Sequence, residues 1–233
     1  MRIGVIGASG NIGSRVLAEA RGRGHDVVAF TRRGAASRPI QEGTEWRDLD
    51  IFDVEAVTRA VQRLDVLVSS YHPGNAANDP GDAIRRAIAD PTAYARAAAV
   101  LLKALESRPA TRLIVVGGAA SLEIATGLTT DDDEVGLRQV LGGLGVPEDY
   151  AVAVRGHRAA LDTLRVSNRR WTYASPSASI GAGERTGRFR VGGDQLLVDD
   201  DRQSRISYED FAAAILDEIE WPRHIQRRFT VGY

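Results

Sequence analysis

A glycine-rich segment near the start of the chain limits the possible folds more than any other feature does. Gly7, Gly10 and Gly13 form a G-x-x-G-x-x-G pattern directly after the apolar run 3–6. Apolar side chains then recur at helical spacing over residues 12–20. In this setting the glycines permit a sharp turn, a close backbone approach to a pyrophosphate and tight helix packing. The free N–H groups of such a helix favour phosphates. The segment therefore predicts a dinucleotide-binding turn, with a ligand-free tight turn as the alternative.

Short apolar runs alternate with longer helical patterns along the rest of the chain. Residues 53–61 and 94–105 fit helices, and the run 44–47 is polar enough for an edge strand. Strands that alternate with helices indicate right-handed crossovers and a parallel sheet. We therefore predict an α/β fold with a parallel sheet. The expected strands are 3–6, 27–30, 44–47, 65–70, 113–116, 171–174 and 229–231.

Three segments fit this alternation less well. Residues 122–149 show no regular pattern, and we interpret them as a loop that covers the site, because long loops in compact domains are often functional. Its acidic run 131–134 is typical of a solvated surface. The runs 188–191 and 195–198 suggest a small hairpin around two glycines. Ser207 can cap a final helix, with Asp210 three residues later.

Length and charge exclude several classes of protein. With 233 residues and no linker or repeat, we expect one domain over 1–233, with a small substrate cap at about 182–201. The net charge of -1 provides no basic field for nucleic acid or an anionic membrane. No apolar run reaches the roughly 18 residues of a membrane span, and a signal peptide is not expected. We expect a cytoplasmic monomer or homodimer that acts on a small molecule.

The inventory of reactive side chains is small. Cysteine is absent, so disulfides and thiolate metal sites are excluded. Lys103 is the only lysine, which excludes any mechanism with two of them. The histidines show no ligand spacing, so we expect no metal. These histidines are His25, His72, His157 and His224.

The end of the second expected strand bears on the choice of cofactor. An NAD site usually has an acidic residue there to bind the ribose hydroxyl. This chain has Thr31, Arg32 and Arg33 instead. Because guanidinium groups suit a 2′-phosphate, the sequence favours NADP(H) over NAD(H), unless both arginines are simply solvated. Asp48 and Leu49 could flank the adenine or belong to an ordinary loop.

Four segments together resemble a known family. They are Gly7-Ala8-Ser9-Gly10-Asn11-Ile12-Gly13, Thr31-Arg32-Arg33, the run 115–122 (VVGGAASL) and the run 171–176 (WTYASP). The chain is similar to atypical short-chain dehydrogenases/reductases of the NmrA-like and flavin reductase/biliverdin reductase B-like type. The resemblance implies a Rossmann-like, doubly wound sheet of order 3-2-1-4-5-6 with a seventh strand and helices on both faces. It also implies NADP(H) at the carboxyl ends of the strands. Some relatives reduce flavins, quinones or carbonyl compounds, and others bind the cofactor only as sensors.

The Tyr-x-x-x-Lys pair of the main dehydrogenase group is absent. Val154 stands four residues after Tyr150, and Ala99 stands four residues before Lys103. His157 is the best substitute, because neutral imidazole can move a proton near pH 7. It could also position the cofactor or be a buried structural side chain. Ser121 could polarise a substrate carbonyl or cap a turn.

These observations favour an NADPH-dependent reductase of a flavin, quinone or enone/carbonyl compound. The alternatives are a non-catalytic NADP(H)-binding regulator and an epimerase or dehydratase. The predicted catalytic residues are Ser121 and His157. The predicted cofactor-binding residues are Gly7, Ser9, Gly10, Asn11, Ile12, Gly13, Thr31, Arg32, Arg33, Asp48, Leu49, Ser69, Ser70, Tyr71, Gly117, Gly118, His157, Pro176, Ser177 and Ala178.

Overall fold

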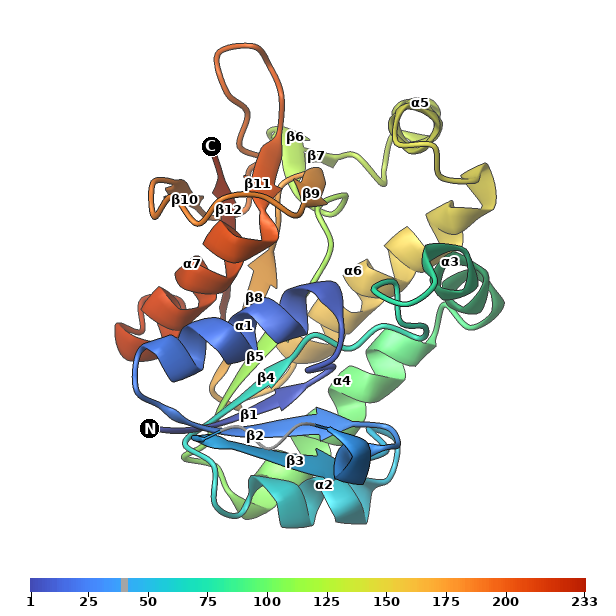
Figure 1. Ribbon diagram of the computed structural model, residues 1–233. Coiled ribbons are helices and arrows are strands. Elements are labelled where there is room, and N and C mark those ends of the chain that lie inside the picture. The colour runs from blue at the N-terminus through green and yellow to red at the C-terminus, as the bar shows by residue number, and fades with distance from the viewer. Residues whose placement is uncertain (39–41) are drawn as a thin grey trace.

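Apolar strands form the centre of the molecule. The computed structural model describes residues 1–38 and 42–233, and within them one sheet has eight strands in the order β10-β12-β8-β5-β4-β1-β2-β3 (Figure 1). The seven predicted strands are parallel neighbours in the expected order, with β3 at one edge. Their bounds are β1 Arg2–Ile6, β2 Asp26–Thr31, β3 Thr44–Asp48, β4 Val66–Ser69, β5 Arg112–Val116, β8 Trp171–Ser175 and β12 Arg227–Gly232.

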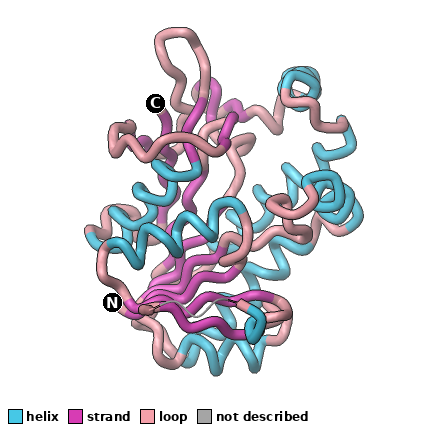
Figure 2. Tube along the Cα trace, viewed as in Figure 1, coloured by secondary structure: helices cyan, strands magenta, loops and turns pink. Residues whose placement is uncertain are grey.

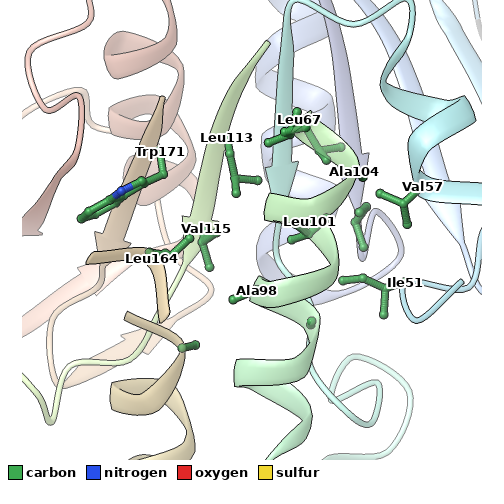
Figure 3. Close-up of a cluster of buried hydrophobic side chains, with 14 of the residues drawn as sticks. Ile51, Val57, Leu67, Ala98, Leu101, Ala104, Leu113, Val115, Leu164 and Trp171 are labelled. Atoms are coloured by element: carbon green, nitrogen blue, oxygen red, sulfur yellow. The ribbon is translucent and has the colours of Figure 1, made fainter. Parts of the chain in front are cut away.

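Helices cover both faces of the sheet, as predicted (Figures 1 and 2). Because side chains alternate along each strand, Leu113 and Val115 join one buried cluster, and Ile114 and Val116 join the other. Figure 3 shows part of the first cluster, to which Leu101 of one covering helix also belongs. One face carries α2 Val54–Val61, α4 Ala93–Ala104 and α6 Ala151–Arg165, and the other carries α1 Asn11–Gly22 and α7 Tyr208–Glu220.

The sequence interpretation missed two helices, of which α3 adds Ala87 to the first cluster. The first, α3 Pro80–Ala89, begins with a capping bond from the Asp82 N–H to the Asp79 carboxylate. The second, α5 Glu134–Gly143, lies inside the segment expected to be irregular, so that prediction was wrong. Leu137 and Leu141 bury one side of α5 and explain why it forms. A short antiparallel pair, β6 Glu123–Ala125 and β7 Leu128–Thr129, precedes it.

The predicted hairpin at 188–198 was also wrong. Strand β10 Arg190–Gly192 pairs antiparallel with β12 and adds the eighth strand to the sheet. Gln195 forms only an isolated bridge to Glu123. The edge of β12 offers unpaired backbone groups, and pairing with it satisfies more of them than a short hairpin would.

The remaining elements lie around the ends of the sheet. Ser207 caps α7 by accepting a hydrogen bond from the Asp210 N–H at 2.9 Å, as predicted. Near this cap, two short strands pair in parallel. They are β9 Ser179–Gly181 and β11 Arg205–Ser207, and the 3₁₀ helices are Ala35–Ser37, Leu105–Ser107 and Glu148–Tyr150.

Candidate functional site

The glycine segment forms a cradle at the carboxyl end of β1. Gly7 has a φ of +75°, and its carbonyl accepts a hydrogen bond from the Gly10 N–H at 2.9 Å. A Cβ on Gly13 would lie 2.1 Å from the Gly7 oxygen and 2.6 Å from the Ser70 Oγ. Gly10 is the N-cap residue of helix α1, which has no side-chain cap and no acidic residue in its first turn. Its first N–H groups are therefore free for an anion, and the cradle fits the pyrophosphate of a dinucleotide.

Polar side chains surround this cradle. The Ser70 hydroxyl donates to the Ile6 carbonyl at 2.9 Å and so braces the turn. The Asn75 amide donates to the Ser9 Oγ at 3.3 Å, and the Asn11 amide donates to the Tyr208 hydroxyl at 3.4 Å. Sequence reasoning missed Asn75, although the Pro/Gly/Asn-rich stretch around it was the available signal.

The end of β2 is basic in the structure as well as in the sequence. The guanidinium groups of Arg32 and Arg33 make no ion pair with any carboxylate in the described part of the chain. Arg32 lies near enough to Tyr71 to lower the pKa of that phenol, although burial has the larger, opposite effect. Two positive charges are thus available where a 2′-phosphate is expected.

The loop after β3 supports the same region. The Asp48 carboxylate accepts a hydrogen bond from the Ala35 N–H at 2.9 Å and shapes the turn after β2. The Leu49 N–H donates to the Thr31 carbonyl at 2.8 Å, and the Leu49 side chain is buried. Both residues therefore fix the backbone around the two arginines.

Two glycines follow β5 and allow other side chains to pack closely against the backbone there. A Cβ on Gly117 would lie 2.0 Å from the Tyr173 Cζ, so only glycine leaves space for this buried ring. A Cβ on Gly118 would lie 3.4 Å from the His157 Cγ. The Tyr173 hydroxyl donates to the His157 carbonyl at 2.9 Å and anchors α6 to the sheet. Gly118 and His157 therefore lie side by side.

Ser121 has a partner that the sequence did not reveal. The Arg228 Nη1 donates to the Ser121 Oγ at 3.1 Å and to its carbonyl at 2.8 Å. Arg228 also pairs with the Asp194 carboxylate at 2.7 Å. The catalytic role of Ser121 stays a prediction, but the residue is only 7% exposed and its Oγ already accepts a hydrogen bond.

Two hydrogen bonds that involve serine hydroxyls hold the loop after β8. Pro176 is buried, and the Ser177 hydroxyl donates to the Val231 carbonyl at 2.8 Å. The Ala178 N–H donates to the Ser204 Oγ at 3.1 Å. This loop joins β8 to β12 and to the segment before β11, and its predicted contact with the cofactor stays a prediction.

Five side chains form what we call the tyrosine–histidine cluster: Tyr71, His72, Tyr94, Tyr150 and His157. The Tyr94 and His157 rings have centroids 3.9 Å apart, and those of His72 and Tyr94 are 5.8 Å apart. Tyr71 meets Tyr94 edge-on at 6.2 Å. The His72 Nε2 lies 3.4 Å from the Tyr150 hydroxyl. The cluster joins the loop after β4 to α4 and to the start of α6.

Burial keeps this cluster uncharged near neutral pH. Burial lowers the pKa of His157 to about 3, with a smaller contribution from His72. Burial also lowers the pKa of His72. Burial raises the pKa of Tyr71 to about 12 and raises the pKa values of Tyr94 and Tyr150. Neutral imidazoles and protonated phenols therefore predominate at pH 7.

Two hollows lie in the neighbourhood of these loops. A cavity of about 10 Å³ lies beneath the cluster, between Tyr71, Tyr94 and His157. An open groove of about 780 Å³ is lined by β9, β11, the segment 182–188 and Tyr233, and it includes Arg188 and Arg205. The first has room for about one water molecule. The second borders the expected cap.

The acidic run is only partly a solvated surface, so that prediction needs correction. Asp131 is 7% exposed and accepts hydrogen bonds from the Thr129 hydroxyl and, at 2.9 Å, from Arg158. The Asp133 carboxylate caps α5 by accepting from the Gly136 N–H at 3.0 Å. The ion pair with Arg158 ties the segment before α5 to the residue after His157.

Within residues 1–38 and 42–233, no three acidic or histidine side chains come together as a metal site would require. Over the same residues, no helix combines the length and apolar character of a membrane span.

Known proteins resemble this chain over nearly its whole length. The model of the NAD(P)H-binding family matches residues 7–222. The uncharacterized protein YwnB of Bacillus subtilis is 34% identical over 233 residues, 99% of this chain and 98% of that protein. A candidate epimerase from Bacteroides thetaiotaomicron has a TM-score of 0.80 at 32% identity, over 100% of this chain and 96% of its own. A candidate NADH-flavin reductase from Streptococcus pneumoniae has a TM-score of 0.79 at 25% identity, and the match covers 100% of this chain and 99% of that protein.

Proposed function

The chain belongs to the NAD(P)H-binding family, and from this premise we propose that it is an oxidoreductase that uses NADPH to reduce a small acceptor. The acceptor class is a flavin, a quinone or an enone/carbonyl compound. The observation that carries the proposal is the glycine cradle at an uncapped helix start, on the same edge of the sheet as the tyrosine–histidine cluster. The name of the flavin reductase relative agrees with this class of acceptor.

The chain's own residues divide the work of binding. The cradle at Gly7, Gly10 and Gly13 holds the pyrophosphate, and Arg32 and Arg33 bind the 2′-phosphate. The bound nicotinamide supplies a hydride. His157 lies beside Gly118 and positions the nicotinamide ring. Arg228 holds the Ser121 side chain, which orients the acceptor. The segments 122–149 and 182–201 cover the acceptor and limit its contact with water.

The preference for NADPH has a direct test. Replacing Arg32 and Arg33 together by serine removes two charge-assisted bonds. We expect the ratio of the NADH and NADPH dissociation constants to fall by about tenfold or more. The matched control is Arg63→Ser, which removes an exposed arginine after α2 and should leave the ratio unchanged. An unchanged ratio in the double variant contradicts the assignment.

The reductase activity is tested by titration and then by turnover. Fluorescence titration with NADPH and NADH measures binding, and menadione, riboflavin and 2-cyclohexenone are then added as acceptors. Acceptor-dependent oxidation of NADPH supports the proposal. Product formation without net oxidation indicates an epimerase or dehydratase. Absence of binding to either nucleotide refutes the role of the cradle.

A non-catalytic regulator is the second candidate, and one observation favours it. The cavity between Tyr71, Tyr94 and His157 holds only about 10 Å³, which is too small for an acceptor molecule. Tight NADPH binding without oxidation by any of the three acceptors supports this candidate. A change in protease sensitivity of the 122–149 segment on binding separates a regulator from an inert binder.

A further inference from the structure

Asn75 is a polar residue that the proposed function leaves without a role. It lies in the segment that joins β4 to α3, which we call the β4 loop (residues 70–79). Its side-chain amide reaches back 66 positions along the chain and donates a hydrogen bond to the Ser9 Oγ at 3.3 Å. Ser9 stands between Gly7 and Gly10. The β4 loop therefore adds a side chain to the cradle where the pyrophosphate is expected.

The orientation of the Asn75 amide is fixed by a second neighbour. The Ala77 N–H, which can only donate, contacts the Asn75 Oδ1 at 3.1 Å. The atom of the amide that faces Ser9 is therefore the nitrogen, which is a donor. An amide turned the other way would present its oxygen to an anion and repel it, whereas this orientation suits a phosphate.

Contacts within and beside the β4 loop hold Asn75 in place. The Asn75 carbonyl accepts hydrogen bonds from the N–H groups of Asn78 and Asp79, each at 3.0 Å. A Cβ on Gly74 would lie 2.3 Å from the Ala83 Cα, so the loop packs directly on α3. The Asn75 amide is thus positioned before any ligand arrives, and binding does not have to order it.

Donor hydrogens remain available on both side chains of this contact. The Ser9 Oγ accepts the bond from Asn75, and its own hydrogen has no acceptor within residues 1–38 and 42–233. The Asn75 amide has two hydrogens, and over the same residues only one of them is used. Two neutral donors from separate segments therefore adjoin the uncapped start of α1, which attracts anions.

We propose that Asn75 is a cofactor-binding residue that, together with Ser9, donates hydrogen bonds to the pyrophosphate of the dinucleotide. The inference rests on the proposed function, because that function assigns the pyrophosphate to the glycine cradle. The diphosphate is common to NADPH and NADH, whereas the 2′-phosphate assigned to the arginines after β2 belongs to NADPH alone. Asn75 therefore controls the affinity for both dinucleotides, and the arginines control the choice between them.

The first test compares Asn75→Ala with Asn78→Ala. Asn78 is an exposed residue of the same loop whose side chain makes no contact with the described residues, so it is the matched control. We expect Asn75→Ala to weaken the binding of NADPH and NADH by the same factor, about tenfold, as for the loss of a hydrogen bond to a charged group. Asn78→Ala should leave both dissociation constants unchanged. Fluorescence titration measures these constants.

A ligand without a diphosphate separates binding from a general disturbance of the site. Adenosine 2′-monophosphate carries the adenine and the 2′-phosphate of NADPH but no pyrophosphate. Displacement of bound NADPH measures its affinity. We expect Asn75→Ala to bind adenosine 2′-monophosphate as tightly as the wild type does.

The second test uses Asn75→Asp, which keeps the turn and changes the charge. The carboxylate retains an oxygen acceptor for the Ala77 N–H, so the urea unfolding midpoint should stay at the wild-type value. The donor is replaced by a negative charge, and we expect NADPH binding about 100-fold weaker than in the wild type. This loss should shrink as salt is added, because the repulsion is screened.

Nitrogen-15 NMR reports the contact without any reaction. The side-chain amide resonance of Asn75 is identified by its absence from the spectrum of Asn75→Asp, and that of Asn78 by its absence from Asn78→Ala. We expect the Asn75 resonance to shift when ADP-ribose is added and the Asn78 resonance to stay. An Asn75 resonance that does not move when ADP-ribose is bound overturns the inference.

The outcomes separate this inference from the proposed function. Unchanged NADPH affinity in Asn75→Ala overturns the role of Asn75 and leaves the cradle and the reductase standing. An equal loss of affinity for NADPH and for adenosine 2′-monophosphate shows a structural effect and also overturns it. A wild-type protein that binds neither NADPH nor NADH overturns both proposals.

Discussion

At the amino ends of the parallel strands, here called the amino edge, a buried carboxylate is bonded to a guanidinium, an imidazole and backbone N–H groups. At the carboxyl ends, called the carboxyl edge, partly buried histidines and tyrosines lie among uncharged rings. Glu218 pairs with Arg112 at 2.8 Å and with the His224 Nδ1 at 2.8 Å, and it also accepts backbone N–H bonds. Burial alone would raise the pKa of Glu218, but the bonds from His224 and Arg223 outweigh it and lower the pKa.

The carboxyl edge shows the opposite arrangement. The His157 ring packs against the Tyr94 ring at a tilt of 36°, and His72 faces Tyr150, with no carboxylate in either contact. Burial therefore removes the charge from these histidines instead of pairing it. A neutral cluster beside a cofactor cradle is suited to positioning and proton transfer, because its groups are not already committed to a salt bridge.

The comparison implies that the amino edge supports stability. Glu218→Gln leaves the Arg112 guanidinium buried without its counter-charge, so we expect about 3–5 kcal/mol less free energy of unfolding. Urea unfolding at pH 7 measures the loss, and NADPH affinity should be unchanged in the folded variant. This is the largest effect that we expect.

An exposed pair provides the control for that prediction. Glu55 is 84% exposed and 3.8 Å from Arg59, so Glu55→Gln should cause no measurable loss. A loss in Glu218→Gln as small as that of the control would show that water reaches Arg112 and would remove the contrast between the edges.

The cradle at the carboxyl edge is next in expected effect. In Gly13→Ala the new Cβ would meet the Gly7 oxygen at 2.1 Å, a backbone atom that cannot move without opening the turn. We expect about 1–3 kcal/mol less stability and about tenfold or more weaker NADPH binding. Gly22→Ala in the same helix has no atom within 4 Å and should raise stability by up to about 1 kcal/mol. Equal NADPH affinity in both variants would contradict the role of the cradle.

Acid should affect the two edges in different pH ranges. The pKa of His157 is lower in the folded protein than its ordinary value near 6.5, so the unfolded chain binds the proton more tightly. Its contribution to stability is present above about pH 6.5 and is lost as the pH falls toward 3, by at most about 1.4 kcal/mol per pH unit. The pKa of Glu218 is lowered from its ordinary value of 4.5, so the contribution of Glu218 to stability is lost only below about that pH.

Unfolding measured from about pH 7 to about pH 5 therefore reports the histidines and not Glu218. We expect the free energy of unfolding of the wild type to fall over this range and that of His157→Gln to fall less. Equal slopes for the two proteins would show that His157 is not buried in its neutral form.

Local patterns in the sequence predicted the main strands and the cradle. Each of these depends on residues close together in the chain, such as Gly7, Gly10 and Gly13 or the run 113–116. The cap of α3 at Asp79 and Pro80 was also a local signal, and it could have been recognised.

The features that the sequence did not predict depend on distant partners. Arg228 reaches Ser121 across 107 positions, and Tyr150 meets His72 across 78. β10 forms because β12 offers it an edge, which no pattern near residue 190 encodes. Asp131 is buried because Arg158 lies over it, 27 positions later. The contacts within the site could therefore be identified only from the folded structure, whereas most of the fold could be predicted from local patterns in the sequence.

The sole lysine provides the smallest expected effect and tests whether the carboxyl edge works without an amine. Lys103 is 66% exposed at the end of α4 and pairs only with Glu106 in the bonds found among the described residues. Lys103→Gln should change stability by no more than about 0.5 kcal/mol and should leave acceptor-dependent NADPH oxidation unchanged. A large loss of turnover with unchanged stability would mean that this ammonium group reaches the acceptor. The cluster would then be charged during turnover, and the contrast with the amino edge would apply only to the resting protein.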